Sequence, residues 1–155
     1  MTTSMERPLT QHIGAGKAPP GLAEYQRAGG YEGFRKIVQM KPAEVVELVK
    51  ASNLRGRGGA GFPTGMKWSF VPTGNEDQQQ KYIIANADEM EPGTFKDRWL
   101  MEGDPHQFIE GMMIAAYAIQ ASVGFIFIRS EYTLAARRLQ AAIEENLQAR
   151  LLGDD

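Results

Sequence analysis

Hydrophobic residues recur along the chain at two different spacings. Helical spacing predicts helices from Pro42 to about Asn53, from Pro105 to about Ala121 and from Glu131 to about Arg150, with shorter helices at 22–27 and 31–38. The mostly apolar segment 82–86 predicts a short buried strand. The unbroken apolar run at 125–128 predicts a strand of the kind that parallel sheets bury on both faces. Strand, helix, strand and helix in this order predict an α/β fold with a right-handed crossover.

Only two strands are clear, and a two-stranded sheet cannot cover both of the helices that follow it. We therefore expect an incomplete sheet, as in the front part of a longer protein. On the last helix the apolar stripe is Leu139, Ile143 and Leu147, and His106 is expected at the surface or as a helix cap. Residues 73–80 are polar and predict a surface loop.

Composition excludes several classes of function. A net charge of -2 argues against general nucleic-acid binding, and no apolar run approaches the roughly 18 residues of a membrane span. With no cysteine, the chain forms no disulfide and no cysteine-ligated zinc or iron–sulfur site. His12 and His106 lie far apart, which disfavours a histidine metal site. The polar segment Met1–Pro20 does not read as a secretion signal, so a cytoplasmic location is the default.

Residues 54–70 form the most unusual segment, because five glycines fall within ten residues among arginine, lysine and aromatic side chains. Glycine amides can fold around an anion, and the flanking cations suit phosphate. The string Gly56-x-Gly58-x-x-Gly61 matches the dinucleotide fingerprint, but that motif needs a strand before it and here a helix is predicted. We interpret the segment as a nucleotide or flavin loop, with a plain turn as the alternative.

A second unusual segment, Asn86 to Gly93, leaves the first predicted strand at its carboxyl end, where α/β sheets bind ligands. Asp88, Glu89 and Glu91 place three carboxylates within four residues, and these repel one another unless a cation or a hydrogen-bond donor lies among them. A divalent metal, the cations of the glycine segment, or ribose and ribityl hydroxyls could serve. The alternative is a solvated acidic turn. Together the two segments predict a site for a flavin mononucleotide or a nicotinamide dinucleotide.

The two unusual segments resemble those of a known family. Residues 54–68 and 86–98 resemble, in order and spacing, the flavin- and NADH-binding subunit of respiratory complex I, the NADH-quinone oxidoreductase. Shorter segments resemble the same subunit at 8–10, 31–33, 105–106, 110–112 and 129–132. The resemblance covers nearly the whole chain and the N-terminal portion of the subunit. It implies an α/β, Rossmann-like FMN-binding domain that is incomplete here, with an arm and helices at 1–53 and the first part of the FMN- and NADH-binding domain at 54–155.

The resemblance also implies the contacts of individual residues. Positions around FMN are matched by Gly56, Gly58, Lys67, Asn86 and Asp88, and Glu89 belongs to the same loop as the last two. Arg57, Gly59, Ala60 and Gly61 belong to the glycine loop by position. Phe62 and Phe70 match aromatics that stack on the adenine of NADH, and Glu91 matches a carboxylate near the nicotinamide. Hydride would pass from NADH to FMN with no catalytic side chain and no bound metal.

In that family, electrons continue through iron–sulfur clusters towards quinone. The 4Fe–4S cluster of the full-length subunit is not ligated by this chain, which also lacks a second flavin loop, a ubiquitin-like domain and a helical domain. The implied partners are other complex I subunits, above all the neighbouring 2Fe–2S subunit and the large iron–sulfur subunit. The implied location is cytoplasmic and peripheral to the inner face of the cell membrane, through the complex.

Two other interpretations stay open. Within the enzymes, the diaphorase subunit of a soluble NAD-linked hydrogenase or formate dehydrogenase shares these motifs. Outside them, the chain is a truncated fragment that is inactive alone, because part of the flavin pocket is missing from it.

Overall fold

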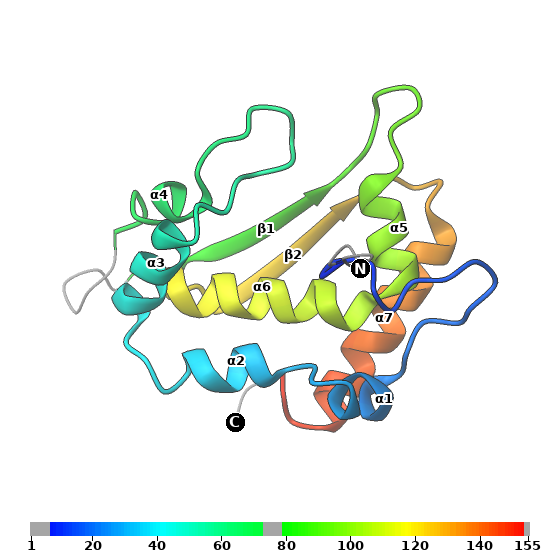
Figure 1. Ribbon diagram of the computed structural model, residues 1–155, viewed down its shortest axis with the longest axis horizontal. Helices are drawn as coiled ribbons and strands as arrows, with labels where there is room; N and C mark the ends of the chain where they lie inside the picture. The colour runs from blue at the N-terminus through cyan, green and yellow to red at the C-terminus, as the bar shows by residue number, and fades with distance from the viewer. Residues whose placement is uncertain (1–6, 73–78, 154–155) are drawn as a thin grey trace, which may run out of the picture. The chain divides into compact units, whose positions relative to one another are not determined.

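The computed structural model describes residues 7–72 and 79–153, and it has the expected α/β class. Its two strands form a parallel sheet (Figure 1). Within the described ranges, no helix is both long and apolar enough to cross a membrane. The expected polar loop at 73–80 falls mostly on residues outside these ranges. In chain order the elements are α1 (Leu22–Arg27), α2 (Glu32–Ile37), α3 (Pro42–Ala51), α4 (Thr64–Trp68), β1 (Tyr82–Ala87), α5 (Lys96–Gly103), α6 (Pro105–Ile119), β2 (Val123–Ile128) and α7 (Thr133–Gln148).

The helices α4 and α5 were not predicted. Both are short, with five and eight residues, and in neither does the side chain of the N-cap residue itself bond to the helix. The first turn of α4 contains a glycine, which is a poor helix former. The N-terminus of α5 is held by a side chain from the preceding loop, so its start has no local sequence signal.

The chain divides into two compact units. One comprises the segment up to Tyr31, residues Asn86–Glu110 and the segment from Phe127 onward. The other comprises Glu32–Ala85 and Gly111–Ile126. The acidic loop therefore belongs to the first unit and the glycine loop to the second.

The second unit is built around a small apolar core. The residues buried in it are Ile37, Val45, Val46 and Ala118, against which Phe34, Met40, Trp68, Ile114 and Tyr117 pack. The hydroxyl of Tyr117 donates to the carbonyl of Met40 at 2.6 Å, so α6 is tied to the segment between α2 and α3. The helix α3 starts with Pro42 at its first position, where the missing N–H is not needed.

One face of the sheet in this unit is exposed, which corrects the prediction of burial on both faces. Neighbouring side chains of a strand point to opposite faces, and Tyr82, Ile84 and Phe125 on one face are each more than half exposed. On the other face Ile83 is half-buried, and Met112 from α6 lies close to Gly124. An apolar run without alternation therefore indicated a strand correctly but not the covering of both faces.

The first unit contains a buried polar cluster around His106, which is 1% exposed. The prediction that His106 lies at the surface was therefore wrong. The Nδ1 atom of His106 lies 3.1 Å from the hydroxyl of Tyr31 and 3.2 Å from the side-chain nitrogen of Asn146, and its Nε2 lies 3.2 Å from a carboxylate oxygen of Glu145. An amide nitrogen only donates, so this arrangement fits a neutral ring that accepts at Nδ1 and donates from Nε2 to Glu145.

Asn146 also corrects the predicted stripe of α7. The buried residues on this helix are Ala135, Leu139, Ala142 and Asn146, whereas Leu147 is 48% exposed. The buried face is therefore rotated by about one residue from the apolar stripe. A polar residue occupies its last position because the histidine of α6 lies against it.

Acid is expected to weaken the fold through His106. Burial lowers the pKa of this imidazole, against the opposing effect of Glu145 and Asp104. Since the pKa is lower in the folded state, the contribution of neutral His106 is complete above its unfolded value of about 6.5 and is lost as the pH falls below it. Between pH 7.5 and 5.5 we expect the protein to lose more unfolding free energy than its His106→Gln variant. Urea unfolding at both pH values measures this, and equal losses would contradict it.

Candidate functional site

The glycine loop is closed at its base by backbone contacts. Arg55 and Pro63 form an isolated antiparallel bridge, the amide of Gly56 donates to the carbonyl of Phe62 at 2.9 Å, and the amide of Thr64 donates to the carbonyl of Leu54 at 2.8 Å. Between these contacts the chain turns through left-handed backbone at Gly59 (φ 105°) and Gly61 (φ 60°), which glycine adopts without strain. The helix α3 precedes the loop and α4 follows it, so the loop lacks the preceding strand of the dinucleotide fingerprint.

The tip of this loop has unused donors and open space. Within the described ranges, the amides of residues 57–61 donate to no acceptor, and Arg57 and Lys67 form no ion pair. A Cβ atom added at Gly58, Gly59 or Gly61 would meet no atom within 4 Å. Free amides and cations of this kind suit an anion such as phosphate.

Aromatic side chains extend the same surface of the second unit. Phe62 and Phe70 are 43% and 68% exposed, and their ring centroids lie 6.2 Å apart at an angle of 57°. The loop backbone beside them is also held by Arg55, whose guanidinium donates to the carbonyl of Gly61 at 3.1 Å. Phe62 and Phe70 therefore lie together and leave ring faces available for stacking, as their predicted role requires.

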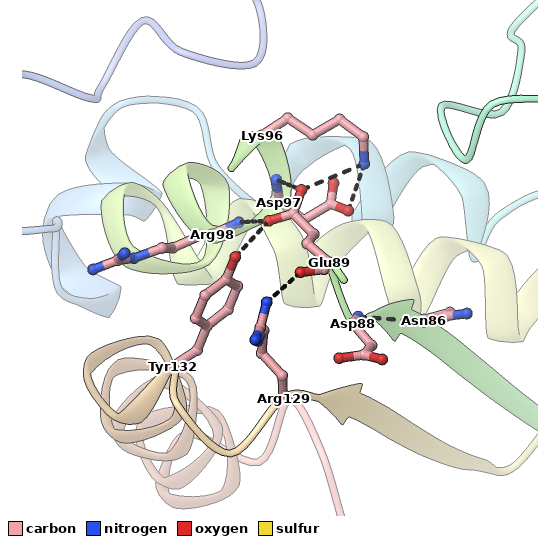
Figure 2. Close-up of polar contacts among 8 residues, drawn as sticks. All are labelled: Asn86, Asp88, Glu89, Lys96, Asp97, Arg98, Arg129 and Tyr132. Carbon is pink, nitrogen blue, oxygen red and sulfur yellow. Dashed lines mark hydrogen bonds and ion pairs between the residues drawn. The ribbon is translucent and has the colours of Figure 1, made fainter. Parts of the chain in front are cut away.

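In the acidic loop, the carboxylates of Asp88 and Glu89 lie in different surroundings (Figure 2). Glu89 is 4% exposed and points inward, where its two oxygens accept the amides of Asp97 at 2.9 Å and Arg98 at 3.0 Å. The Tyr132 hydroxyl lies 3.4 Å and the Lys96 ammonium 3.8 Å from the same carboxylate. Burial raises the pKa of Glu89, but these donors outweigh burial and hold the pKa below its usual value.

Glu89 therefore acts as a cap for α5, because it satisfies amides at the start of that helix from outside it. Its carboxylate is used inside the protein, which leaves Asp88 and Glu91 for a ligand. Asn86 shapes the chain between the strand and these residues, since its side-chain oxygen accepts the amide of Asp88 at 3.2 Å. Within the described residues, the carboxylates of Asp88 and Glu91 accept no hydrogen bond and form no ion pair.

From sequence, no role in the site was assigned to Arg129, which lies directly after β2. Its Nη1 donates to the backbone carbonyl of Glu89 at 2.6 Å, and its guanidinium lies 5.5 Å from the ring centroid of Tyr132. The sequence signal that could have indicated Arg129 is its position, because it is a cation at the carboxyl end of a predicted strand, the end at which the acidic loop also leaves its own strand. The charged side chains after this loop also pair, Lys96 with Asp97 at 2.5 Å and Arg98 with Glu102 at 2.9 Å.

The two loops offer complementary chemistry. The glycine loop presents donors and positive charge, which fit phosphate and ring oxygens, and exposed aromatic faces. The acidic loop presents two carboxylates without protein partners in the described ranges, and these accept hydrogen bonds from sugar or ribityl hydroxyls. No group of three or more acidic or histidine side chains in those ranges could hold a metal ion. Taken by itself, each loop therefore fits a part of a phosphorylated cofactor that has hydroxyls and flat rings. The glycine loop fits its phosphate and flat rings, and the acidic loop fits its hydroxyls.

Comparisons with known proteins agree with this chemistry. Residues 49–152 match the family model of the Nuo51 FMN-binding domain. The chain is 56% identical over 133 residues to the F 2 subunit of NADH-quinone oxidoreductase of Rhizobium meliloti (strain 1021), a match that covers 85% of this chain and 31% of that protein. It is 50% identical over 152 residues to the F subunit of NADH-quinone oxidoreductase of Escherichia coli (strain K12), covering 97% of this chain and 34% of that protein.

A solved structure also matches. A crystal structure of an NAD+-reducing [NiFe]-hydrogenase in the H2-reduced state is 42% identical, with a TM-score of 0.63, over 72% of this chain and 19% of that chain. The chain spans about a third of the length of its Rhizobium meliloti and Escherichia coli relatives. The family model covers well over half of the chain, and the chain therefore belongs to the Nuo51 FMN-binding domain family.

Proposed function

We propose that this chain is the first part of the NADH-oxidising subunit of an NADH-quinone oxidoreductase. The observation that carries the proposal is the pair of loops, one with free amides and cations and the other with two unpaired carboxylates in the described ranges, on a chain of the FMN-binding family. Two relatives named as NADH-quinone oxidoreductase subunits, at 50% and 56% identity, support the choice of enzyme. The site residues, the cofactor contacts and the division at residues 53 and 54 are part of this proposal.

When bound, FMN would accept hydride from NADH, and the chain would bind and orient both molecules. The amides of residues 57–61, together with Lys67, would hold phosphate or ring oxygens. The carboxylate of Asp88 would accept ribityl hydroxyls, and Asn86 would keep the backbone at Asp88 turned towards them. Phe62 and Phe70 would stack on adenine, and Glu91 would lie near the nicotinamide.

The proposed assembly follows from the relatives rather than from the site. We propose that the chain works in a multi-subunit complex beside subunits that carry iron–sulfur clusters, which its relatives named as subunits of NADH-quinone oxidoreductases support. It would then lie at the cytoplasmic side of the membrane through the complex. The second candidate is the diaphorase subunit of a hydrogenase, which the hydrogenase structure at 42% identity supports. Purification of the native complex separates the two, because only one of them contains a [NiFe] centre.

Replacing Asp88 by alanine tests the flavin assignment. In the full-length subunit we expect Asp88→Ala to raise the dissociation constant for FMN by about tenfold or more, because hydrogen bonds to a charged group are worth about 1.5–3 kcal/mol. Quenching of flavin fluorescence on titration with the apoprotein measures this constant. Glu24→Ala, an exposed carboxylate on α1, is the matched control and should leave it unchanged. Wild-type affinity in Asp88→Ala would remove Asp88 from the flavin site.

A further inference from the structure

Arg129 contacts the acidic loop through its backbone. The Nη1 atom donates to the carbonyl oxygen of Glu89 at 2.6 Å, and no other hydrogen bond to that carbonyl is found within the described ranges (Figure 2). A bond to a carbonyl fixes the plane of the peptide that joins residue 89 to residue 90. The side chain of Glu89 is fixed separately, by the start of α5. Two independent sets of contacts therefore hold the loop at Glu89. Those of the carboxylate fix the side chain, and the hydrogen bond from Arg129 fixes the plane of the peptide.

The guanidinium of Arg129 is itself held in place. Its Nε and Nη2 donate to the carboxylate of Glu131 at 3.1 and 3.4 Å, which leaves Nη1 for Glu89. The ring of Tyr132 packs against the guanidinium and directs its own hydroxyl to the Glu89 carboxylate at 3.4 Å. The hydrogen bond to Glu131 raises the pKa of Arg129, and the hydrogen bond from Arg129 holds the pKa of Glu131 at about 2, so both stay charged near neutral pH.

This arrangement connects the two strand ends. Glu89 lies two residues after β1, and Arg129 lies one residue after β2. Asp88 and Glu91 lie on either side of the fixed peptide. In the described part of the chain neither carboxylate accepts a hydrogen bond or forms an ion pair within 4 Å, and Asp88 interacts with Arg129 only through the longer-range attraction of their charges. Because no hydrogen bond in that part of the chain holds these side chains, their directions depend on the backbone that carries them.

From these contacts we propose that Arg129 is a positioning residue, which fixes the Glu89–Met90 peptide so that Asp88 and Glu91 face the bound cofactor and NADH. The expected effect on the binding of FMN and NADH rests on the proposed function. The effect of Arg129 on the Glu89–Met90 peptide does not. Loss of the contact releases the peptide, and both carboxylates then sample directions that do not meet the ligand. We expect the affinities for FMN and NADH to fall together, while the rate of hydride transfer in protein saturated with both changes less.

Whether Arg129 fixes the Glu89–Met90 peptide is tested without a ligand. Hydrogen exchange of the full-length apoprotein is compared between wild type, Arg129→Met and Arg129→Lys, with Arg137→Met as the control. Arg137 is exposed on α7, and its Nε donates to Thr133 of its own helix at 3.3 Å. We expect the amide of Thr94, which donates to the carbonyl of Glu91 at 3.0 Å, to exchange about tenfold faster in Arg129→Met than in wild type or Arg137→Met. Equal exchange in all four proteins would overturn the inference.

The functional consequence is tested on the same four proteins. The dissociation constant for FMN and the KM for NADH should each rise about tenfold in Arg129→Met, and by less than threefold in Arg129→Lys, whose ammonium can still donate to the carbonyl. A purely stabilising arginine would lower the yield of folded protein but leave both constants unchanged, and that result would overturn the positioning role. A wild-type subunit that binds no FMN would instead overturn the proposed function, and the exchange comparison would still decide the role of Arg129.

Discussion

Replacing Glu89 by alanine is expected to lower the free energy of unfolding by about 3 kcal/mol. The carboxylate is buried and accepts the amides of Asp97 and Arg98 at the start of α5. Its removal leaves two amides without their acceptor, at about 1–3 kcal/mol for each buried unsatisfied group, less what water recovers. It also removes a negative charge from a helix N-terminus, where such a charge is stabilising. Urea unfolding followed by circular dichroism measures the difference.

Glutamine at this position should cost less than alanine but more than an exposed substitution. One oxygen still accepts an amide, whereas the new NH₂ group faces a second donor. Glu91→Gln in the same loop is the matched control, because Glu91 is exposed, and it should change stability by less than about 0.5 kcal/mol. Equal stability of the Glu89 and Glu91 variants would show that Glu89 does not cap α5.

The same contacts fix the direction of the acid effect at Glu89. Its pKa is lower in the folded state, so its stabilising contribution is complete above the ordinary carboxyl value and is lost as the pH falls below it. His106 acts at higher pH, because its ordinary value is near 6.5. The contribution of His106 is therefore lost at higher pH than that of Glu89.

The main elements followed from sequence because their signals are local. Pro42 and Pro105 mark the starts of α3 and α6, and apolar runs mark both strands. The two loops of the candidate site were also found from sequence, since clustered glycines and clustered carboxylates are rare in a packed core. The sequence did not predict that Glu89 is buried while Asp88 and Glu91 remain available to a ligand. The carboxylate of Glu89 is bound by amides of α5, a helix whose start has no sequence signal of its own.

Non-local contacts explain the other differences. His106 is buried because Tyr31 and Asn146, from distant parts of the chain, meet it there. Phe125 has the pattern of a buried strand residue and is 53% exposed, since burial depends on what covers the face and not on the strand. Arg129 reads in sequence as an ordinary cation, and its partner is a backbone carbonyl, which has no residue signature.

At Gly65 the helix α4 lies tightly against α3. A Cβ atom there would lie 2.4 Å from the backbone nitrogen of Lys50 and 2.8 Å from its Cα. Backbone atoms cannot turn away as a side chain can, so one of the two helices must move. Since α4 follows the base of the glycine loop directly, where Thr64 donates to Leu54 at 2.8 Å, such a movement also displaces one end of that loop.

Gly65→Ala is therefore expected to destabilise the protein by about 2 kcal/mol, although alanine is the better helix former. Overpacking costs about 1–3 kcal/mol, and the contact with a backbone nitrogen places this site at the upper end, while the gain in helix propensity is at most about 1 kcal/mol. Gly58→Ala is the matched control. Its φ is not left-handed and its added methyl group meets no atom within 4 Å, so the loss of unfolded-state entropy should leave its stability unchanged or slightly raised. Urea unfolding of both variants shows whether Gly65→Ala lowers or raises the free energy of unfolding. A stabilised Gly65→Ala would show that α3 and α4 are not packed as tightly as these distances require.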